Sequence, residues 1–359
     1  MALSPYSPGR QSGPLITYAV SLTSCDSEAA NPGNGNRHDS HLQGLSDGSR
    51  VLAHSIALAH ENSKYSNYNF VAFVHSSAAE SPCAEILSEL GFSIKNVPTP
   101  VDVAEIQHDN LRESIVKNGC CGEKELIKFY SYTLLGSAVV VHLDIDVLIM
   151  KPLDDLFDGI ISGAASAYFT KDYNLVNPGK SAGIQGGFFV VKPDSSVFAR
   201  INEIVLTGTF TGGRGWMDSG VGMFWGGMTF QGLAAYYYEV ESTTGVEVSR
   251  CEYNNMVDNP KTKEGVCRDG SAGGDCEDCR YVTPSSVHSC HFTICAKPWT
   301  CQDYFSDKQA LCKDFHTKWF ETRRDYEESV GTWDPSRYSG SKYGGFCKGG
   351  GAKNYIAIP

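Results

Sequence analysis

The chain has 359 residues, of which 41% are hydrophobic and 20% are charged. These are ordinary values for a globular protein with a sizeable core, so they exclude an intrinsically disordered or fibrous chain. The formal net charge of −11 argues against a nucleic-acid partner, because such a partner requires clustered lysine and arginine.

The N-terminal residues and the cysteine content bear on the compartment. Residues 1–14 lack the apolar run of a signal peptide, and we expect them to be disordered. No apolar segment reaches the roughly 18 residues that a membrane span needs. The 13 cysteines are typical of disulfide-bonded secretory proteins. The Golgi or secretory lumen is therefore slightly favoured, and the cytoplasm is the alternative if the chain is complete as given.

The first hundred residues alternate between strand-like and helix-like patterns. This alternation predicts parallel βαβ units in one Rossmann-like sheet, with a nucleotide lying across the strand ends. The expected elements are a strand at 15–22, a polar loop at 24–49, a helix at 51–61, a strand at 70–75, a helix at 83–90 and a strand at 92–97.

Residues 138–143 form a β-branched apolar run that predicts a buried strand, and Asp144 and Asp146 follow it directly. In an extended backbone these two side chains point the same way, toward the carboxyl end of the strand. Carboxylate oxygens suit Mn²⁺ or Mg²⁺ holding a diphosphate. A solvated strand end is the alternative for such a common triplet. The helix predicted at 123–135 carries Lys128. Its ammonium either reaches the bound diphosphate or its sugar, or extends to water.

Two Gly-rich segments follow. Gln185 precedes the pair Gly186-Gly187 and the predicted strand at 188–191, so the backbone there either approaches a sugar or makes a tight turn. The segment 212–232 is aromatic and contains Asp218 as its only carboxylate. A lone acid among aromatic rings suits a sugar pocket, although such a loop also packs for structural reasons.

The last third of the chain predicts an insertion, a helix and a tail. Residues 251–290 are polar and rich in glycine and cysteine, so we expect an insertion into a single domain at 15–312. The motif at 291–299, HFTICAKPW, offers an imidazole for a metal and a lysine for phosphate. An amphipathic helix is expected at 313–330, and a flexible Gly-rich tail at 331–359.

These segments together resemble glycosyltransferase family eight, the glycogenin and galactinol synthase group of retaining transferases with the GT-A fold. The resemblance covers about residues 15–299 and rests on HLDIDVLIMKPLDDLF at 142–157, the lysine before it, and the motif at 291–299. It implies an α/β nucleotide-diphospho-sugar transferase fold with a single mixed sheet flanked by helices. It also implies transfer of a hexosyl or pentosyl group from a UDP-sugar to a carbohydrate, glycoprotein or small polyol.

The resemblance implies a role for individual residues. Asp144, Asp146 and His291 are the expected metal ligands, for Mn²⁺ with Mg²⁺ as the alternative, and Lys128 and Lys297 are the expected contacts to the diphosphate. The expected donor contacts also include Leu22, Thr23, Ile145 and Gly187, and Gln185, Asp218 and Lys128 are the catalytic candidates.

Ile294 departs from the pattern, because the family has a glycine there that lets the backbone approach phosphate. Gln185 is a poor nucleophile, so front-face attack by the acceptor is preferred over double displacement, for which Asp218 remains a candidate. Two other functions stay open: an inactive carbohydrate-binding or nucleotide-sugar-binding protein, and a sugar nucleotidyltransferase.

Four cysteines, Cys276, Cys279, Cys290 and Cys295, have a spacing that could bind zinc. The alternative is disulfides, which would stabilise an insertion that otherwise lacks a core. We expect disulfides.

Overall fold

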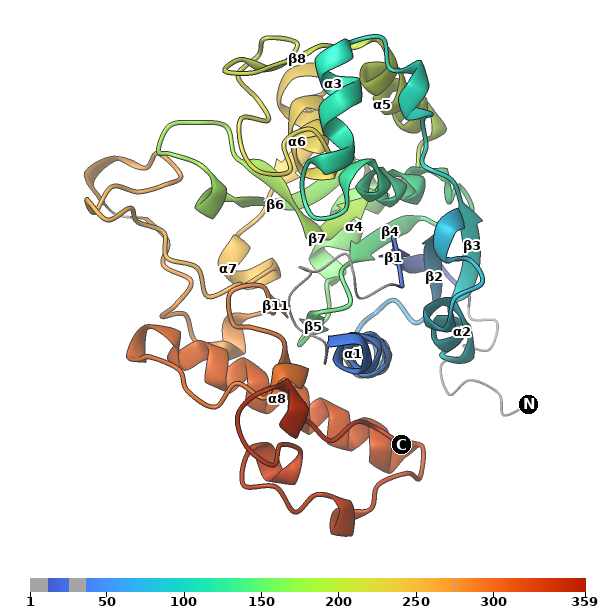
Figure 1. The fold of residues 1–359 in the computed structure, drawn as a ribbon, viewed down its shortest axis with the longest axis vertical. Helices are drawn as coiled ribbons and strands as arrows, with labels where there is room; N and C mark the ends of the chain where they lie inside the picture. Colours follow the sequence, from blue (N-terminus) through green and yellow to red (C-terminus); the bar gives the residue numbers. More distant parts are fainter. Residues whose placement is uncertain (1–11, 26–36, 275) are drawn as a thin grey trace.

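The computed structural model describes residues 12–25, 37–274 and 276–359, and its centre is a seven-stranded sheet with the strand order β10-β6-β7-β4-β1-β2-β3 (Figure 1). Within this sheet β7 runs antiparallel to both of its neighbours, and the other pairs are parallel. The structure therefore confirms the predicted α/β class with one mixed sheet flanked by helices. The strands are β1 (Ile16–Leu22), β2 (Tyr68–His75), β3 (Ser93–Val97), β4 (Val139–Leu143), β6 (Ala167–Asp172), β7 (Gly183–Val191) and β10 (Gly245–Glu247).

Helices cover both faces of the sheet because its strands are apolar on both sides. Alternate residues of β1 and β4 pack against one helical layer, and the intervening residues pack against the other. The first layer contains α1 (Arg37–His60), α2 (Pro82–Glu89) and α4 (Asp154–Ser162). The second contains α3 (Asp109–Ser114), the 3₁₀ helix η5 (Gly122–Thr133), α5 (Ser195–Thr207) and α6 (Phe230–Tyr236).

Helix α1 corrects two predictions. The structure has one helix from Arg37 to His60 where the sequence predicted a loop at 24–49 and a shorter helix at 51–61; residues 26–36 lie outside the described residues. Gly44 and Gly48 favoured the loop, but they serve packing instead. A Cβ atom at Gly44 would lie 2.3 Å from the indole nitrogen of Trp299, and one at Gly48 would lie 3.0 Å from the same ring. The glycines let Trp299 lie against the helix.

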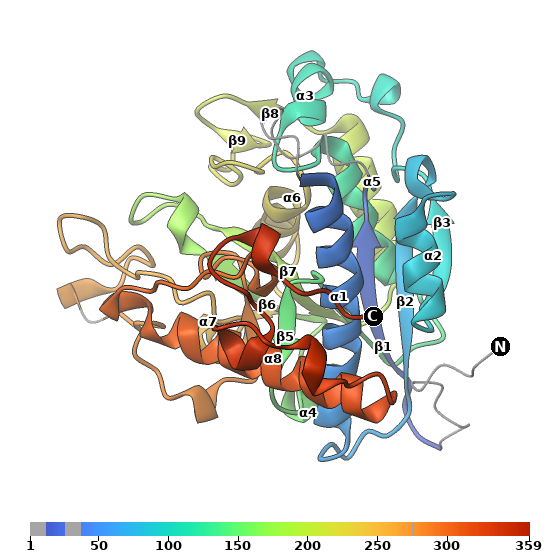
Figure 2. The same cartoon turned by 60° about the horizontal axis from the view of Figure 1, so that its bottom comes forward.

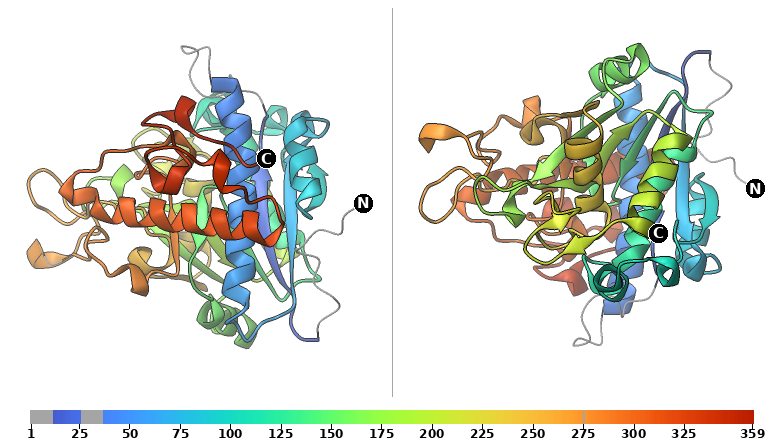
Figure 3. Two further views of the ribbon diagram at one scale, coloured as in Figure 1. Left: turned by 90° about the horizontal axis from the view of Figure 1, so that it is seen from below. Right: turned by 90° about the horizontal axis from the view of Figure 1, so that it is seen from above.

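A second, smaller layer lies below the sheet and brings the C-terminal third of the chain to α1. Strand β5 (Val147–Ile149) pairs antiparallel with β11 (Ser289–His291). Helix α8 (Ala310–Ser329) runs across α1, as Figures 2 and 3 show. His54 on α1 lies 2.7 Å from the Asp325 carboxylate on α8. The other α-helix in the described residues is α7 (Arg250–Tyr253), and the other strands there are the two-residue β8 (Phe210–Thr211) and β9 (Gly215–Trp216).

The residues after α8 pack into this layer, which corrects the prediction of a flexible tail at 331–359. Tyr338, Phe346 and Cys347 are buried with the apolar face of α8. The carboxylate of Asp47 on α1 accepts hydrogen bonds from the Tyr355 hydroxyl at 2.7 Å and from the Ile358 amide at 2.9 Å. The glycine and lysine content suggested flexibility, but the aromatic residues spaced through the segment supply a core.

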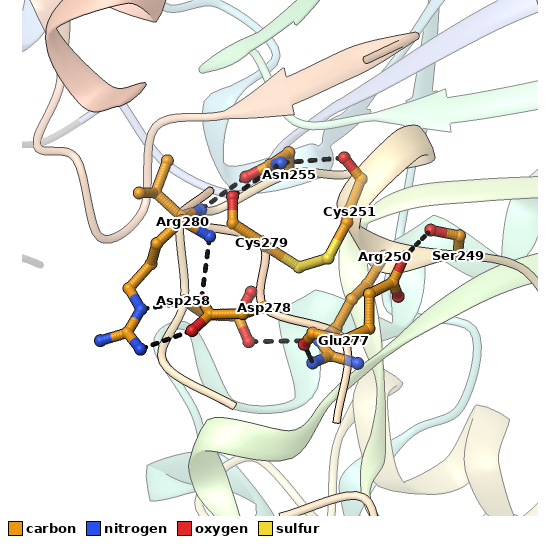
Figure 4. The surroundings of a disulfide bond; sticks show 10 residues. Ser249, Arg250, Cys251, Asn255, Asp258, Glu277, Asp278, Cys279 and Arg280 are labelled. Atoms are coloured by element: carbon orange, nitrogen blue, oxygen red, sulfur yellow. Dashed lines mark hydrogen bonds and ion pairs between the residues drawn. A yellow bond between two sulfur atoms is a disulfide. The ribbon is translucent and has the colours of Figure 1, made fainter. Parts of the chain in front are cut away.

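Five disulfides are present in the described residues: Cys25–Cys83, Cys251–Cys279, Cys267–Cys276, Cys295–Cys312 and Cys301–Cys347. The disulfide prediction is confirmed and the zinc array does not form, since Cys276, Cys279 and Cys295 each have a different partner and Cys290 is a buried free thiol. Figure 4 shows the side chains around Cys251–Cys279. No helix in the described ranges is long and apolar enough to cross a membrane.

Candidate metal and diphosphate site

Asp144 and Asp146 lie in the tight turn between β4 and β5. The Asp144 amide donates to the Gly187 carbonyl at 3.2 Å, and the Val147 amide donates to the Asp144 carbonyl at the same distance. The backbone is therefore turned rather than extended between the two carboxylates. They still address one region, as the sequence predicted, at the carboxyl end of β4.

His291 reaches the two aspartates because β11 pairs with β5, which places His291 opposite Val147. The Phe292 amide donates to the Asp146 carbonyl at 2.9 Å and fixes the register. Ligand atoms of Asp144, Asp146 and His291 all lie within 4.8 Å of one another. A Cβ atom at Gly187 would lie 2.4 Å from the His291 ring, so only glycine leaves room for the imidazole here.

Two lysines flank the carboxylates. The Lys128 ammonium on η5 donates to Asp144 Oδ1 at 2.7 Å and to the Gly186 carbonyl at 2.9 Å. The Lys297 ammonium donates to Asp146 Oδ2, which also lies 3.3 Å from His291 Nε2. The site thus consists of two carboxylates, one imidazole and two cations.

The protonation states follow from burial and from these ion pairs. Burial lowers the pKa of His291 to about 4, so its imidazole is neutral. Burial alone would raise the pKa of Asp144, but the charge and hydrogen bond of the Lys128 ammonium outweigh it and hold the pKa below its ordinary value. Burial likewise opposes the charge on Lys128, yet the carboxylates of Asp144 and Glu125 leave its pKa raised. A neutral imidazole beside ionised carboxylates is the donor form that a divalent cation requires.

The residues present fit a divalent metal ion. His291 Nδ1 is buried and has no hydrogen-bond partner, although buried polar atoms are normally satisfied. His291 Nε2 lies 3.0 Å from the Thr293 hydroxyl. Two carboxylates and one imidazole form a mixed oxygen and nitrogen set that suits Mn²⁺, and also Mg²⁺ with added water.

Gln185 and a third carboxylate, Asp172, extend the site along β6 and β7. Gln185 Oε1 accepts from the Gly187 amide at 2.5 Å and from Asn254 Nδ2 at 3.3 Å. Burial, and then the neighbouring Asp258, raise the pKa of Asp172 to about 6. The charge of Asp172 also acts on His291. Sequence reasoning missed Asp172 because it was an isolated acid at the end of a strand that was not predicted.

Asp218 does not join this group. It is exposed, has a positive φ of 59° and pairs with Arg214 at 3.3 Å. Trp216 is fully buried against Phe210, whereas Trp225 is exposed. The expected aromatic sugar pocket around Asp218 is therefore not formed by these side chains.

The loop that carries Asp218 instead forms one wall of a cavity of about 740 Å³. The opposite wall is the connection between β6 and β7, and the cysteine-rich insertion adds Arg268. Two of its polar atoms, Asn174 Nδ2 and Arg268 Nε, are buried without a hydrogen-bond partner. The polar lining includes Asn174, Ser181, Ser219, Glu239 and Arg268.

Leu22, Thr23 and Ile145 lie beside the aspartates. Strand β1 is parallel to β4 and pairs Ala19 with His142, so Leu22 and Thr23 follow at the same edge as Asp144. Leu22 is buried, and Thr23 and Ile145 are half-buried. The Ile145 carbonyl faces α1, where a Cβ atom at Gly48 would lie 3.1 Å away.

Helix α8 anchors the loop that carries Lys297. Cys295, two residues before Lys297, is bonded to Cys312 on α8. The imidazole of His316, also on α8, donates from Nε2 to the Cys295 carbonyl at 2.9 Å. The pairing of Cys295 with Cys312 was not predicted, because sequence spacing does not determine disulfide connectivity.

No protein-family model matches the sequence, and no curated protein matches it. Solved structures that match include the galactosyltransferase LgtC in complex with donor and acceptor sugar analogs, with 12% identity over 89% of this chain and 100% of that chain and a TM-score of 0.42. The glycosyltransferase GlyE of Streptococcus pneumoniae TIGR4 has 10% identity over 89% and 64% of the two chains and a TM-score of 0.44. Mouse xyloside xylosyltransferase 1 has 12% identity over 77% and 96% and a TM-score of 0.40. At these values the matches assign neither a family nor an activity to this chain.

Proposed function

We propose that this protein is a metal-dependent glycosyltransferase that moves a sugar from a nucleoside diphosphate, with UDP as the expected nucleotide, to a hydroxyl acceptor with retention. The observation that carries the proposal is the Asp144, Asp146 and His291 group, whose ligand atoms lie within 4.8 Å, between two lysines. It stands at the carboxyl end of a central strand, where open α/β sheets bind ligands.

Asp144, Asp146 and His291 would hold Mn²⁺, or Mg²⁺. A divalent cation bound there supplies positive charge that stabilises a departing diphosphate. Asp144 and Asp146 come from one turn, whereas His291 comes from β11, which the disulfide-bonded insertion leads into. The metal site therefore depends on pairing between β5 and β11.

Lys128 and Lys297 would bind the diphosphate oxygens. Each ammonium already lies against one of the two carboxylates, so each is within reach of a diphosphate at that pair. Their charges oppose the negative charge that develops on the leaving group, which is the usual electrostatic contribution in phosphate chemistry. The nucleoside would lie at the end of β1, near Leu22, Thr23 and Ile145.

Gln185 would orient the transferred sugar. Its carbonyl oxygen is engaged by Gly187 and Asn254, which leaves the amide NH₂ to contact a sugar hydroxyl. An amide is a poor nucleophile, and the carboxylate of Asp218 is exposed and paired with Arg214. Front-face attack, in which the acceptor hydroxyl enters beside the leaving phosphate, therefore fits better than a covalent glycosyl intermediate.

The cavity between the β6–β7 connection and the Asp218 loop would hold the acceptor. Its wall residue Ser181 lies two residues before the start of β7 and six residues before Gly187, a separation of at most roughly 20 Å. Its wall also carries the exposed polar residues Ser219 and Glu239, whose side chains suit hydroxyl groups. A carbohydrate acceptor of a few sugar units would span this distance.

The test measures UDP release from a panel of UDP-sugars in Mn²⁺ or in EDTA. We expect Mn²⁺-dependent hydrolysis of one donor, lost in Asp146→Ala and retained in Asp158→Asn, which changes an exposed aspartate on α4. Asp218→Asn distinguishes the two mechanisms, because this substitution would abolish turnover only if Asp218 were the nucleophile. No release from any donor, together with no Mn²⁺-dependent stabilisation by UDP, would contradict the proposal.

A binding protein without turnover is the second candidate. Ile294 stands where the resembling family has glycine, and its side chain is 39% exposed beside the metal ligand strand. UDP binding that depends on Mn²⁺ without hydrolysis of any UDP-sugar would favour this candidate. If an Ile294→Gly variant gained hydrolysis of a UDP-sugar, the absence of turnover in the wild type would be due to Ile294.

A further inference from the structure

Two adjacent cysteines, Cys120 and Cys121, lie in the turn between the 3₁₀ helices η4 (Ile115–Lys117) and η5. Their sulfur atoms are 2.9 Å apart. Cys120 is exposed and Cys121 is half-buried. The described residues contain one other free thiol, Cys290, which is completely buried in β11.

The carboxylate of Glu125 holds the backbone of this turn in place. The amides of Cys120 and Cys121 both donate to Glu125 Oε1, at 2.8 and 3.3 Å, and the Thr229 hydroxyl donates to Glu125 Oε2 at 3.0 Å. Gly122 has a φ of +60°, and a Cβ atom there would lie 2.5 Å from the Val116 carbonyl. The two sulfur atoms therefore meet in a fixed turn.

The pair has the chemistry of a reactive thiol. A hydrogen bond from the Cys120 thiol, assisted by the Thr23 hydroxyl, lowers the pKa of Cys121 to about 7. A thiolate is the form that attacks a disulfide. Burial raises the pKa of Cys290 far above its ordinary value, so that thiol is inert.

The pair also lies beside the candidate donor site. Cys121 contacts Thr23 at the end of β1. The positive charge of Lys128, one of the two cations that flank the aspartates, helps to lower the pKa of Cys121, so the Cys121 thiolate lies within electrostatic reach of that cation. A chemical change at the pair therefore alters the electrostatic field where a diphosphate would bind.

We propose that Cys120 and Cys121 are a redox modification site, in which a small-molecule disulfide such as oxidised glutathione converts the adjacent thiols to a vicinal disulfide at the rim of the donor site. The Cys121 thiolate attacks the small disulfide, forms a mixed disulfide and releases one thiolate. Cys120 then loses its proton and attacks the Cys121 sulfur, which releases the second thiolate. The two cysteines are oxidised and the small disulfide is reduced to two thiols.

This disulfide would be reversible. Adjacent Cα atoms are about 3.8 Å apart, which is less than the roughly 4.4 Å minimum of ordinary disulfides, and such bonds are strained and easily reduced. Apart from the free Cys290, the other described cysteines form five bonds between positions at least nine residues apart. The vicinal pair would therefore respond to a redox potential at which those five bonds persist.

The first experiment identifies the bond by mass spectrometry. The folded protein is equilibrated with glutathione buffers, alkylated and digested with trypsin, which releases residues 118–124 with both cysteines. We expect this peptide to lose two hydrogen atoms as the buffer becomes oxidising, while the Cys290 thiol stays unmodified. Two free thiols in every buffer, or glutathione adducts without ring closure, would overturn the proposal. A Cys120→Ser variant should stop at the mixed disulfide with glutathione.

The second experiment connects the bond to the donor site and rests on the proposed function. Oxidation removes the partial negative charge of Cys121 near Lys128, so Mn²⁺-dependent UDP binding should tighten by about two- to fivefold. The Cys120→Ser/Cys121→Ser double variant should bind equally in both buffers. Equal binding by oxidised and reduced wild type would overturn the connection. If UDP binds in neither state, the proposed function fails, and the peptide masses still decide the disulfide.

Discussion

The two regions that build the candidate site are held together in different ways. Asp144, Asp146 and Gln185 come from the central sheet, whose strands are buried on both faces. His291 and Lys297 come from the C-terminal third, where four of the five disulfides in the described residues lie. The first region is positioned by apolar burial and strand register, and the second by covalent links.

Ionic contacts reinforce the second region. On α8, Arg323 and Glu327 form a fully buried ion pair at 2.9 Å, and the Arg323 guanidinium lies 4.6 Å from the Phe346 ring. Removing one partner of such a pair leaves an uncompensated charge. The C-terminal third has a smaller apolar core than the sheet, so loss of its links should displace half of the site while the sheet stays folded.

The largest effect is expected where the two regions meet, at Asp146. Asp146→Asn removes the carboxylate charge that Lys297 and His291 share. Mn²⁺-dependent UDP affinity, measured by calorimetry, should fall on the order of a hundredfold. Asp158→Asn on α4 is the matched control and should bind normally. An affinity within twofold of wild type in Asp146→Asn would place the metal elsewhere.

Removal of the Cys295–Cys312 disulfide tests the covalent support. The bond closes a loop of 17 residues, so replacing both cysteines with serine should cost about 3 kcal/mol of unfolding free energy. It should also weaken UDP binding, because Lys297 loses its anchor. Replacing Cys267 and Cys276 is the control, since that bond lies in the insertion. Equal UDP affinity in both variants would mean that α8 does not position Lys297.

Protonation of His316 at acid pH should lower the free energy of unfolding of the C-terminal region. Burial lowers the pKa of this imidazole from 6.5 to about 4, so its stabilising effect is complete above pH 6.5 and is lost as the pH falls toward 4. Linkage gives a loss of about 2 kcal/mol by about pH 5. Chemical denaturation of wild type and His316→Gln across this range measures it. Parallel pH profiles for the two proteins would refute the assignment.

The smallest effect is expected at Gly187, where a strand of the sheet meets an imidazole from the other region. Gly187→Ala places a methyl group 2.4 Å from the His291 ring, which must move. Mn²⁺ affinity, measured from the signal of free Mn²⁺, should fall about tenfold. Gly186→Ala is the control, because its methyl group would lie 3.2 Å from the flexible end of Lys128 and 3.4 Å from the Phe230 ring, away from His291. Equal Mn²⁺ affinities in Gly187→Ala and Gly186→Ala would show that the His291 ring can move without loss of metal binding.

The sequence predicted the sheet region better than the C-terminal region for a physical reason. Burial leaves an apolar pattern in the chain, so β1, β2 and β4 and the aspartates after β4 could be located. Disulfide connectivity leaves no such pattern. The ordered conformation of residues 331–359 depends on contacts with Asp47 and Cys301, which are distant in sequence. Asp172 was missed because its significance comes only from its neighbours Asp258 and His291.

Pulsed electron paramagnetic resonance of bound Mn²⁺ with UDP tests the central claim, that both regions contribute to one metal and diphosphate site. The account predicts nitrogen coupling from one imidazole together with phosphorus coupling from UDP. The nitrogen coupling should disappear in His291→Gln. Bound Mn²⁺ that shows phosphorus coupling without imidazole nitrogen, or neither coupling, would contradict it.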